Sequence, residues 1–204
     1  MLFCNLLFNA NTLELKLGSH EAACYDIHAH LRGPVTPEDV APVIREIKWY
    51  DGYNQPHTSM PDVVFDSDVP ICTFTLNPKC RALIPTGMVM DIPLGFSARL
   101  HPRSGLAVKN GVTLINAEGV IDADYCHEVF VPLHNTTNTP FKITHGDRIA
   151  QVEIVEYDTS SLAIALYGNQ TKSMEDGIYT IYDSDNNIYK QLDQQNIMIK
   201  RKLK

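Results

Sequence analysis

The chain has 204 residues, of which 44 % are hydrophobic and 20 % are charged, and its formal net charge is −7. A chain of this length and composition can bury a core of its own, which excludes a disordered or collagen-like protein. The excess of acid excludes a protein that coats nucleic acid, because phosphate backbones require a basic surface, but it leaves room for a pocket for one nucleotide.

The cysteines and the start of the chain indicate a cellular compartment. The five cysteines are scattered and odd in number, which is typical of reduced thiols rather than of a disulfide framework. The apolar N-terminal residues have no Lys or Arg before Lys16 and are too few to span a bilayer. We therefore expect a cytoplasmic protein without a membrane segment.

Alternation of apolar and polar residues with a period of two dominates the sequence. The alternating segments are 13–17, 25–31, 96–101, 129–133 and 150–154. In the second segment the apolar residues share one face, and Asp26, His28 and His30 share the other. Short alternating runs separated by Gly, Pro, Asn and Asp are typical of antiparallel sheets, so the sequence predicts an all-β domain.

Three stretches depart from this pattern. Thr36 before Pro37, followed by apolar residues with helical spacing, predicts a helix near 36–50. Residues 51–79 are rich in Pro, Asp and Ser and are expected to form a long surface excursion. After residue 157 we expect strands at 178–182 and 196–199 and a basic end, 200–204, whose ordinary interpretation is a solvated tail.

Four polar motifs follow one another along the chain: 23–27, 101–107, 116–125 and 146–151. Arg103, Ser104 and the backbone N–H of Gly105 offer a set of donors that suits phosphate oxygens. Asp122 stands at the end of an apolar segment, where a carboxylate can take a proton from water. Singly, each motif also fits a structural role: an Asp in a turn, an Arg in a surface pair, a Tyr in the core.

Together, the motifs resemble those of the trimeric dUTPase (dUTP diphosphatase) family in order, spacing and residues, over most of residues 22–156. The strongest matches are 102–107 and 119–125. The resemblance implies an all-β, dUTPase-like domain over 1–157, a β-clip or distorted jelly-roll barrel, with an insertion at about 33–80 that contains one short helix. It further implies a homotrimer with active sites between subunits. Segment 158–204 is atypical of the family, and we expect it to act as a lid or an inter-subunit arm.

The resemblance also implies an activity, the Mg²⁺-dependent hydrolysis of dUTP to dUMP and pyrophosphate. Asp122 would deprotonate the water that attacks the α-phosphorus, and Asp26 would hold Mg²⁺ through water. Phosphate contacts are assigned to Arg103, Ser104, Gly105 and Gln151. Contacts with the uracil edge are assigned to Asn116 and to the backbone of Gly119, Val120 and Ile121. Tyr125 would pack under the sugar and exclude a 2′-hydroxyl.

The sequence departs from the family pattern in three places. Cys126 and His127 follow Tyr125 where the family has Arg-Gly, and we expect His127 to be an exposed strand-end side chain. The link between the first two motifs, from residue 32 to residue 80, is unusually long. No glycine follows Gly177, so the Gly-rich fifth motif of the family is missing. The insertion or the basic end, with Lys200, Arg201 or Lys202 as phosphate partners, would close the site instead. Such departures suit a viral or phage member.

Three other interpretations remain open. A non-catalytic, dUTPase-like trimer could bind a nucleotide or a regulatory partner. A dCTP deaminase would need an acid where Pro132 stands and an arginine where Val108 stands, which disfavours deamination. His20, His28 and His30 could form a metal site, although ordinary surface histidines explain them better.

Overall fold

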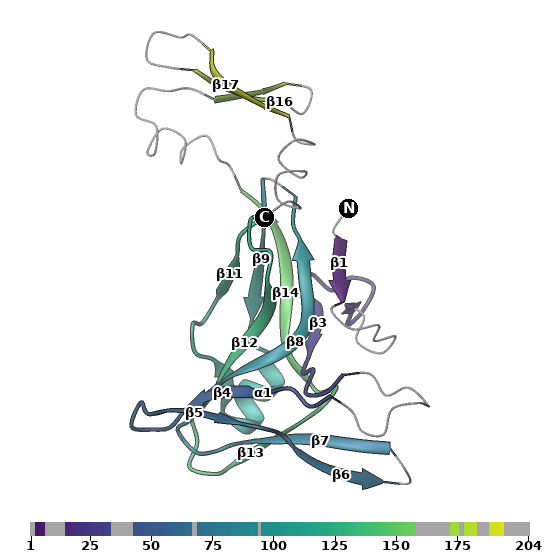
Figure 1. Ribbon diagram of the computed structural model, residues 1–204, viewed down its shortest axis with the longest axis vertical. Coiled ribbons are helices and arrows are strands. Elements are labelled where there is room, and N and C mark those ends of the chain that lie inside the picture. The colour runs from purple at the N-terminus through teal and green to yellow at the C-terminus, as the bar shows by residue number, and fades with distance from the viewer. Residues whose placement is uncertain are drawn as a thin grey trace. The chain divides into compact units, whose positions relative to one another are not determined.

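The computed structural model describes residues 3–6, 15–33, 43–66, 69–93, 95–157, 172–175, 178–182 and 188–193. The chain divides into two compact units, Met1–Val155 and Glu156–Lys204 (Figure 1). The second unit contains one antiparallel sheet in the order β15-β16-β17, formed by β15 (Lys172–Glu175), β16 (Ile178–Tyr182) and β17 (Ile188–Asp193). The strand predicted at 178–182 is confirmed. The strand predicted at 196–199 and the basic end lie outside the described residues.

The first unit is built from three sheets. The largest has the order β10-β12-β8-β4-β5, with β1 also paired to β8; its strands are β1 (Phe3–Leu6), β4 (Ile47–Tyr50), β5 (Pro56–Ser59), β8 (Arg81–Asp91), β10 (Val112–Leu114) and β12 (Glu128–Asn135). The second has the order β11-β9-β14-β3-β2, formed by β2 (Lys16–Leu17), β3 (Tyr25–His28), β9 (Phe96–His101), β11 (Gly119–Ile121) and β14 (Arg148–Glu156). The third, β13-β7-β6, consists of β6 (Asp62–Asp66), β7 (Val69–Leu76) and β13 (Phe141–Thr144).

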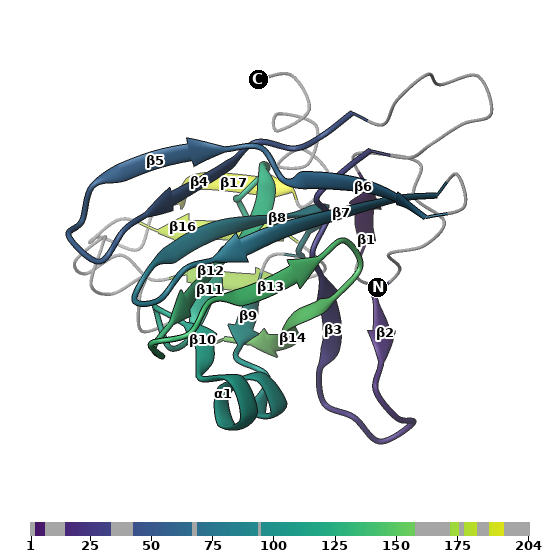
Figure 2. The same ribbon diagram turned by 90° about the horizontal axis from the view of Figure 1, so that it is seen from below.

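One hydrophobic core draws on strands of all three sheets, and the predicted alternation supplies it. Figure 2 shows the arrangement of these strands. Ile27 on β3 and Val131 and Leu133 on β12 are fully buried. Each such side chain contributes about 1.5–3 kcal/mol when it is removed from water. The prediction of an all-β domain is therefore confirmed, because inward-facing residues with a period of two can bury their side chains only as strands.

The prediction of a helix near 36–50 is wrong over its described part, 43–50, which contains no helical residue. Ile47–Tyr50 forms strand β4, which pairs antiparallel with both β5 and β8. Ile47 is fully buried in the core. Pairing on both sides satisfies the backbone of β4 and buries this side chain, and tertiary packing of this kind overrides a local helical pattern. Residues 34–42 lie outside the described residues.

The expectation of a surface excursion at 51–79 is wrong for strand β7, although the side chains of β5 and β6 are mostly exposed. Strand β7 lies within this stretch and pairs with β6 on one side and β13 on the other. Its residues Cys72, Phe74 and Leu76 are buried. Part of the polar composition of the stretch lies on the exposed strands β5 and β6, whereas these alternate side chains of β7 complete the core.

The described helix is α1 (Ser104–Asn110), which follows β9 in the second motif, and not a helix in the insertion. None of its residues is buried, so it carries no apolar stripe that could have revealed it. Its end does have a sequence signal. Gly111 adopts the left-handed conformation with φ 62°, and its N–H donates to the carbonyl oxygen of Ala107.

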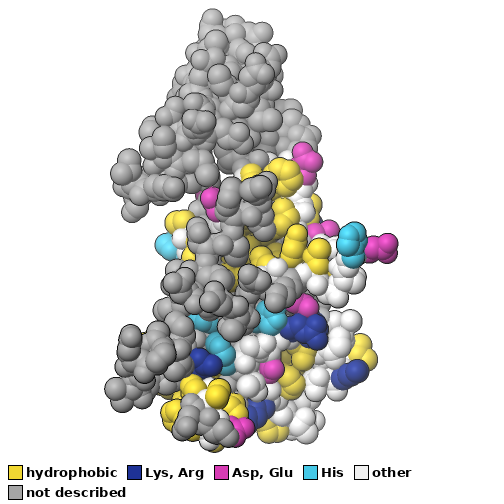
Figure 3. All heavy atoms as spheres, turned by 90° about the vertical axis from the view of Figure 1, so that its right-hand side faces the viewer, with side chains coloured by type: hydrophobic (Ala, Val, Ile, Leu, Met, Phe, Trp, Pro, Cys, Tyr) yellow, Lys and Arg dark blue, Asp and Glu magenta, His cyan; other side chains and the backbone are white. Residues whose placement is uncertain are grey.

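Charged and apolar side chains are grouped on the surface of the first unit. In the space-filling view, hydrophobic side chains adjoin a region where histidine and basic side chains gather (Figure 3). Within the part of the chain that the structure describes, no helix is long and apolar enough to cross a membrane.

Candidate active site

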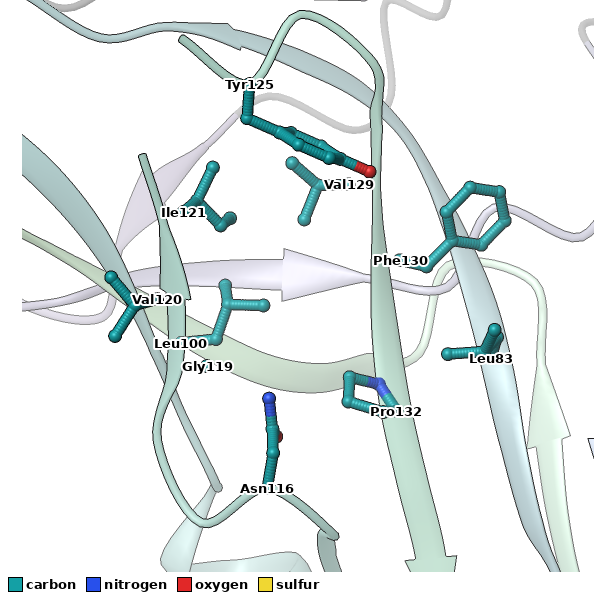
Figure 4. Close-up of a pocket in the computed structure, with 10 residues that line it drawn as sticks. All are labelled: Leu83, Leu100, Asn116, Gly119, Val120, Ile121, Tyr125, Val129, Phe130 and Pro132. Atoms are coloured by element: carbon teal, nitrogen blue, oxygen red, sulfur yellow. The ribbon is translucent and has the colours of Figure 1, made fainter. Parts of the chain in front are cut away.

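A pocket opens between β11 and β12 (Figure 4). It is lined by Leu83, Leu100, Asn116, Gly119, Val120, Ile121, Tyr125, Val129, Phe130 and Pro132. Five of these residues are the ones expected to bind the base and the sugar. The amide of Asn116 lies at one end of the pocket, Tyr125 lies at the other, and apolar side chains line the walls between them. None of these ten side chains is acidic. Pro132 lines the pocket at the position where a dCTP deaminase would need an acid.

The turn before β11 shapes the amide end of the pocket. Ala117 has a positive φ of 56°, and the N–H of Glu118 donates to the carbonyl oxygen of Asn116 at 2.5 Å. A Cβ atom at Gly119 would lie 3.0 Å from Nδ2 of Asn116 and 3.3 Å from Cβ of Leu100. The glycine therefore lets the Asn116 amide lie against the strand backbone, where an amide and main-chain groups together can recognise the edge of a base.

The segment after β11 carries Asp122 and Tyr125. Asp122 is exposed at the end of the strand, and its carbonyl oxygen accepts the N–H of Tyr125 at 3.1 Å, which closes a turn. The Tyr125 hydroxyl donates to the carbonyl oxygen of Glu128 at 2.9 Å. This bond orients the ring over the pocket, and the neighbouring carboxylate of Asp122 stays accessible to water. His127 is exposed, as expected, with its ring edge-on to Tyr125.

The expected phosphate-binding residues form a second group around Asp26. Its Oδ1 lies 3.2 Å from Nε of Arg103, and its Oδ2 lies 3.1 Å from Nη1 of Arg148. Arg103 Nη1 also donates to the carbonyl oxygen of Arg148 at 3.1 Å. The group therefore has two guanidinium groups around one carboxylate, a net positive set that suits an anion with several oxygens.

Three more predicted residues belong to this second group. Gln151 lies opposite Asp26 in the pairing of β14 with β3, and its Nε2 donates to the carbonyl oxygen of Pro102 at 3.1 Å. Ser104 and Gly105 are the first residues of α1, directly after Arg103, and both are exposed. Sequence reasoning gave no role to Arg148, although it stands in the fourth motif. Its contact with Asp26 depends on the pairing of two strands that are distant in the chain.

The two groups lie at opposite ends of strand β9 in one chain. Ile121 pairs with Ala98, so Asp122 comes next to the start of β9, whereas Arg103 follows its far end (Figure 1). At roughly 3.3 Å per residue, about 20 Å of extended backbone separates Ser97 from Arg103. A single chain therefore does not bring Asp122 and Arg103 to the same phosphate.

His30 lies in the interior, against expectation, and its ring lies close to that of the partly buried His145. The His30 side chain is 2 % exposed, and its ring lies 5.3 Å from that of His145. Burial and nearby arginines lower the pKa of each to about 4, so both are neutral at pH 7. The Nδ1 of His145 accepts the N–H of Leu31 at 3.1 Å. The alternation placed His30 on a solvated face, but the chain leaves the regular ladder of β3 after His28.

The described side chains do not form a metal cage. No group of three or more His, Cys, Asp or Glu residues among them could hold an ion, which includes His20, His28 and His30. Asp26 and Gln151 do supply oxygen atoms of the kind that Mg²⁺ prefers. One carboxylate and one amide fit an ion that arrives with a triphosphate and keeps several waters, rather than an ion held by protein alone.

Comparison with known sequences identifies one family. The sequence model of the dUTPase family matches residues 57–181. The deoxyuridine 5′-triphosphate nucleotidohydrolase of Rhizobium rhizogenes is 55 % identical over 82 residues, 40 % of this chain and 53 % of that protein. The enzyme of the same name from Roseobacter denitrificans is 37 % identical over 136 residues, 62 % of this chain and 88 % of that protein. The chain spans about half the length of the first of these relatives.

Solved structures share the fold. The dUTPase from Streptococcus mutans superposes with a TM-score of 0.51 at 19 % identity, over 77 % of this chain and 95 % of that one. The dUTPase from phage phi11 of S. aureus superposes with a TM-score of 0.53 at 19 % identity, over 78 % of this chain and 92 % of that one. These structures confirm the expected β fold, and the family match confirms the resemblance to dUTPases.

Proposed function

The chain belongs to the dUTPase family, and from this premise we propose that it hydrolyses dUTP to dUMP and pyrophosphate. The observation that carries the proposal is the segment from Asn116 to Tyr125, which builds a pocket with an amide at one end and an aromatic ring at the other. Asp122 is exposed, and its carbonyl oxygen accepts the N–H of Tyr125 in the turn that follows β11. The relatives whose names specify deoxyuridine triphosphate support the choice of substrate.

The pocket would select the nucleotide before any chemistry occurs. Asn116 and the backbone of Gly119 to Ile121 would pair with the uracil edge, and cytosine would leave buried donors and acceptors unpaired. Tyr125 would pack against the deoxyribose and leave no room for a 2′-hydroxyl. The apolar walls exclude water from the base and raise the cost of a wrong hydrogen-bonding pattern.

Asp122 would act as the general base. It would orient a water molecule and accept one of its protons as the water oxygen bonds to the α-phosphorus. The bond from this phosphorus to the bridging oxygen breaks at the same centre, and that oxygen leaves with pyrophosphate. Arg103, Ser104 and the Gly105 N–H would hold the phosphate oxygens and stabilise the charge that builds up on them.

Mg²⁺ would belong to this site as a companion of the substrate. When bound, it would neutralise charge on the triphosphate. Asp26 and Gln151 are the residues that would meet it, through water, and the two arginines on Asp26 leave that carboxylate only an indirect part. A related dUTPase from phage phi11 of S. aureus is described as coordinating a structural Mg(II) ion.

The active unit would be a homotrimer. Asp122 and Arg103 lie at opposite ends of β9, so a complete site needs the first from one copy and the second from another. Exposed apolar side chains near the pocket, among them Leu83, Val120 and Phe130, support contact between copies. The four described cysteines are free thiols, which supports a reducing compartment, the cytoplasm.

The decisive experiment measures pyrophosphate release from dUTP with Mg²⁺ for the wild type, Asp122→Asn and Asp62→Asn. Asp62 is an exposed carboxylate on β6, so its variant removes the same charge away from the pocket. We expect Asp122→Asn to lower kcat by at least about 100-fold and Asp62→Asn to leave it unchanged. Equal rates in all three proteins would reject the general base. Binding of dUTP without turnover would identify a non-catalytic nucleotide-binding protein instead.

A further inference from the structure

We propose that Arg45 is a positioning residue for sugar discrimination, acting through Glu128 on Tyr125; this inference rests on the function proposed above. Arg45 comes from the long link between the first two motifs, which the family resemblance leaves without a role. Tyr125 and Glu128 bracket the turn into β12. The argument depends on how the start of that strand is held.

The pairing of β12 with β8 is irregular where β12 begins. Glu128 pairs with Val89, but Phe130 pairs with Pro85, so the register shifts between them. Gly87 lies on the bulged strand with φ +69°. A bulge interrupts the ladder of backbone hydrogen bonds and leaves groups that other partners must satisfy.

Side chains replace the missing ladder bonds. The Thr86 hydroxyl donates to the carbonyl oxygen of Val129 at 2.6 Å. Oε1 of Glu128 accepts the N–H of Gly87 at 2.8 Å. The carboxylate of Glu128 therefore ties the first residue of β12 to the bulge, and its orientation decides where the strand starts.

Arg45 fixes that carboxylate. Its Nη2 donates to Oε2 of Glu128 at 2.5 Å, and the two side chains are only 15 % and 10 % exposed. The backbone beside the guanidinium is also held, since the N–H of Arg45 donates to the carbonyl oxygen of Leu31 at 2.9 Å. Both carboxylate oxygens of Glu128 thus have a partner, and a shielded ion pair of this kind is costly to break.

The main chain of Glu128 connects the ion pair with Arg45 to the side chain of Tyr125. Its hydroxyl donates to the carbonyl oxygen of the residue whose side chain Arg45 holds. The ring forms one end of the pocket, where a deoxyribose would lie. A ring held in place excludes a 2′-hydroxyl by contact, whereas a ring free to shift outward admits one.

The test compares Arg45→Ala, Arg45→Lys and Ile143→Val with the wild type. Ile143 is buried on β13, outside the turn at 122–128. Its replacement by valine should destabilise the fold, so this variant controls for a general loss of stability. For each protein, kcat and KM are measured with dUTP and with UTP. In parallel, amide hydrogen exchange is followed in a peptide that covers residues 122–130.

Arg45→Ala should lower the preference for dUTP over UTP, taken as the ratio of kcat/KM values, by about tenfold or more. Exchange at 122–130 should be faster in this variant than in Ile143→Val. Arg45→Lys should lie between, because lysine keeps the charge but not the guanidinium geometry. If Arg45→Ala does not fold, Glu128→Gln, which can keep the Gly87 bond and loses the charge, takes its place.

The outcomes separate this inference from the proposed function. An unchanged preference in an active Arg45→Ala enzyme overturns the inference and leaves the function intact. Exchange no faster than in Ile143→Val also overturns it, whether or not the protein hydrolyses dUTP. A wild type that does not hydrolyse dUTP defeats the proposed function, and the exchange comparison still decides whether Arg45 holds the Tyr125 turn.

Discussion

Oδ1 of Asp26 lies 3.2 Å from Nε of Arg103, an ion pair that joins strand β3 to the residue before helix α1. The same carboxylate also pairs with Arg148. Asp26 therefore organises two guanidinium groups, which gives it a structural role in addition to the metal contact expected of it.

Asp26→Asn should separate these roles. The Asp26 side chain is 14 % exposed, so loss of its charge should lower the free energy of unfolding by about 1–3 kcal/mol. We expect kcat for dUTP to fall by about tenfold, because Arg103 loses the contact that orients it. The stability control is Glu118→Gln, which breaks an exposed pair with Arg99 and should cost under about 1 kcal/mol. Full stability and full activity in Asp26→Asn would contradict the organising role.

Gly119→Ala should damage the base end of the pocket. The added Cβ would lie 3.0 Å from Nδ2 of Asn116, so that amide must move away from the strand. We expect KM for dUTP to rise by about tenfold or more while the fold survives. Gly18→Ala is the matched control, since nothing lies within 4 Å of a Cβ there. A KM equal to the wild-type value would show that the amide does not bind substrate at this position.

Gly87→Ala should destabilise the bulge of β8 by about 2–4 kcal/mol. Gly87 has φ +69°, and a Cβ would lie 2.9 Å from Cγ of His30, which is buried. Gly95→Ala isolates the backbone contribution, because Gly95 has φ +87° with nothing within 4 Å. Its cost should be about 1–2 kcal/mol. Denaturant unfolding measures both, and equal losses would mean that contact with His30 adds nothing.

Stability should fall as the pH falls from about 6.5 to about 4. His30 and His145 have their pKa lowered from 6.5 to about 4 in the folded chain, chiefly by burial. Between these values the unfolded chain binds more protons, so protonation favours unfolding. The stabilisation is fully present above pH 6.5, and each histidine should contribute about 2 kcal/mol of the loss.

Urea unfolding at successive pH values measures this loss. His145→Gln should flatten the dependence, whereas His127→Gln, at an exposed position, should leave it unchanged. A free energy of unfolding that stays constant from pH 6.5 to pH 5 would show that His30 and His145 do not govern acid stability.

Patterns along the chain were sufficient for the β fold and for the five pocket residues that lie in the third motif. The period of two places Ile27, Val131 and Leu133 in the core wherever the strands pair, because side chains alternate between faces whatever the partner. The third motif is contiguous, so Asn116, Gly119 and Tyr125 line one pocket through strand β11 and the turns on either side of it. Local geometry of this kind is encoded by neighbouring residues.

Contacts between segments that are distant in the chain could not be predicted from the sequence pattern. The sequence near 36–50 has helical spacing, but Ile47–Tyr50 forms strand β4. Its backbone pairs with β5 on one side and with β8 on the other. His30, placed on a polar face by its spacing, is buried beside His145. The ion pairs of Asp26 and of Arg45 each join strands or loops that are far apart in the chain.

The amino-acid sequence by itself determined which side chains alternate toward a core and which residues share the turn around Asp122, since both depend on spacing over a few residues. Only the tertiary structure decided which charges neutralise one another, which histidines lose their protons, and that Asp122 and Arg103 lie at opposite ends of β9. The physical reason is that burial, pairing and register depend on distances between segments, and these distances exist only after the strands have assembled.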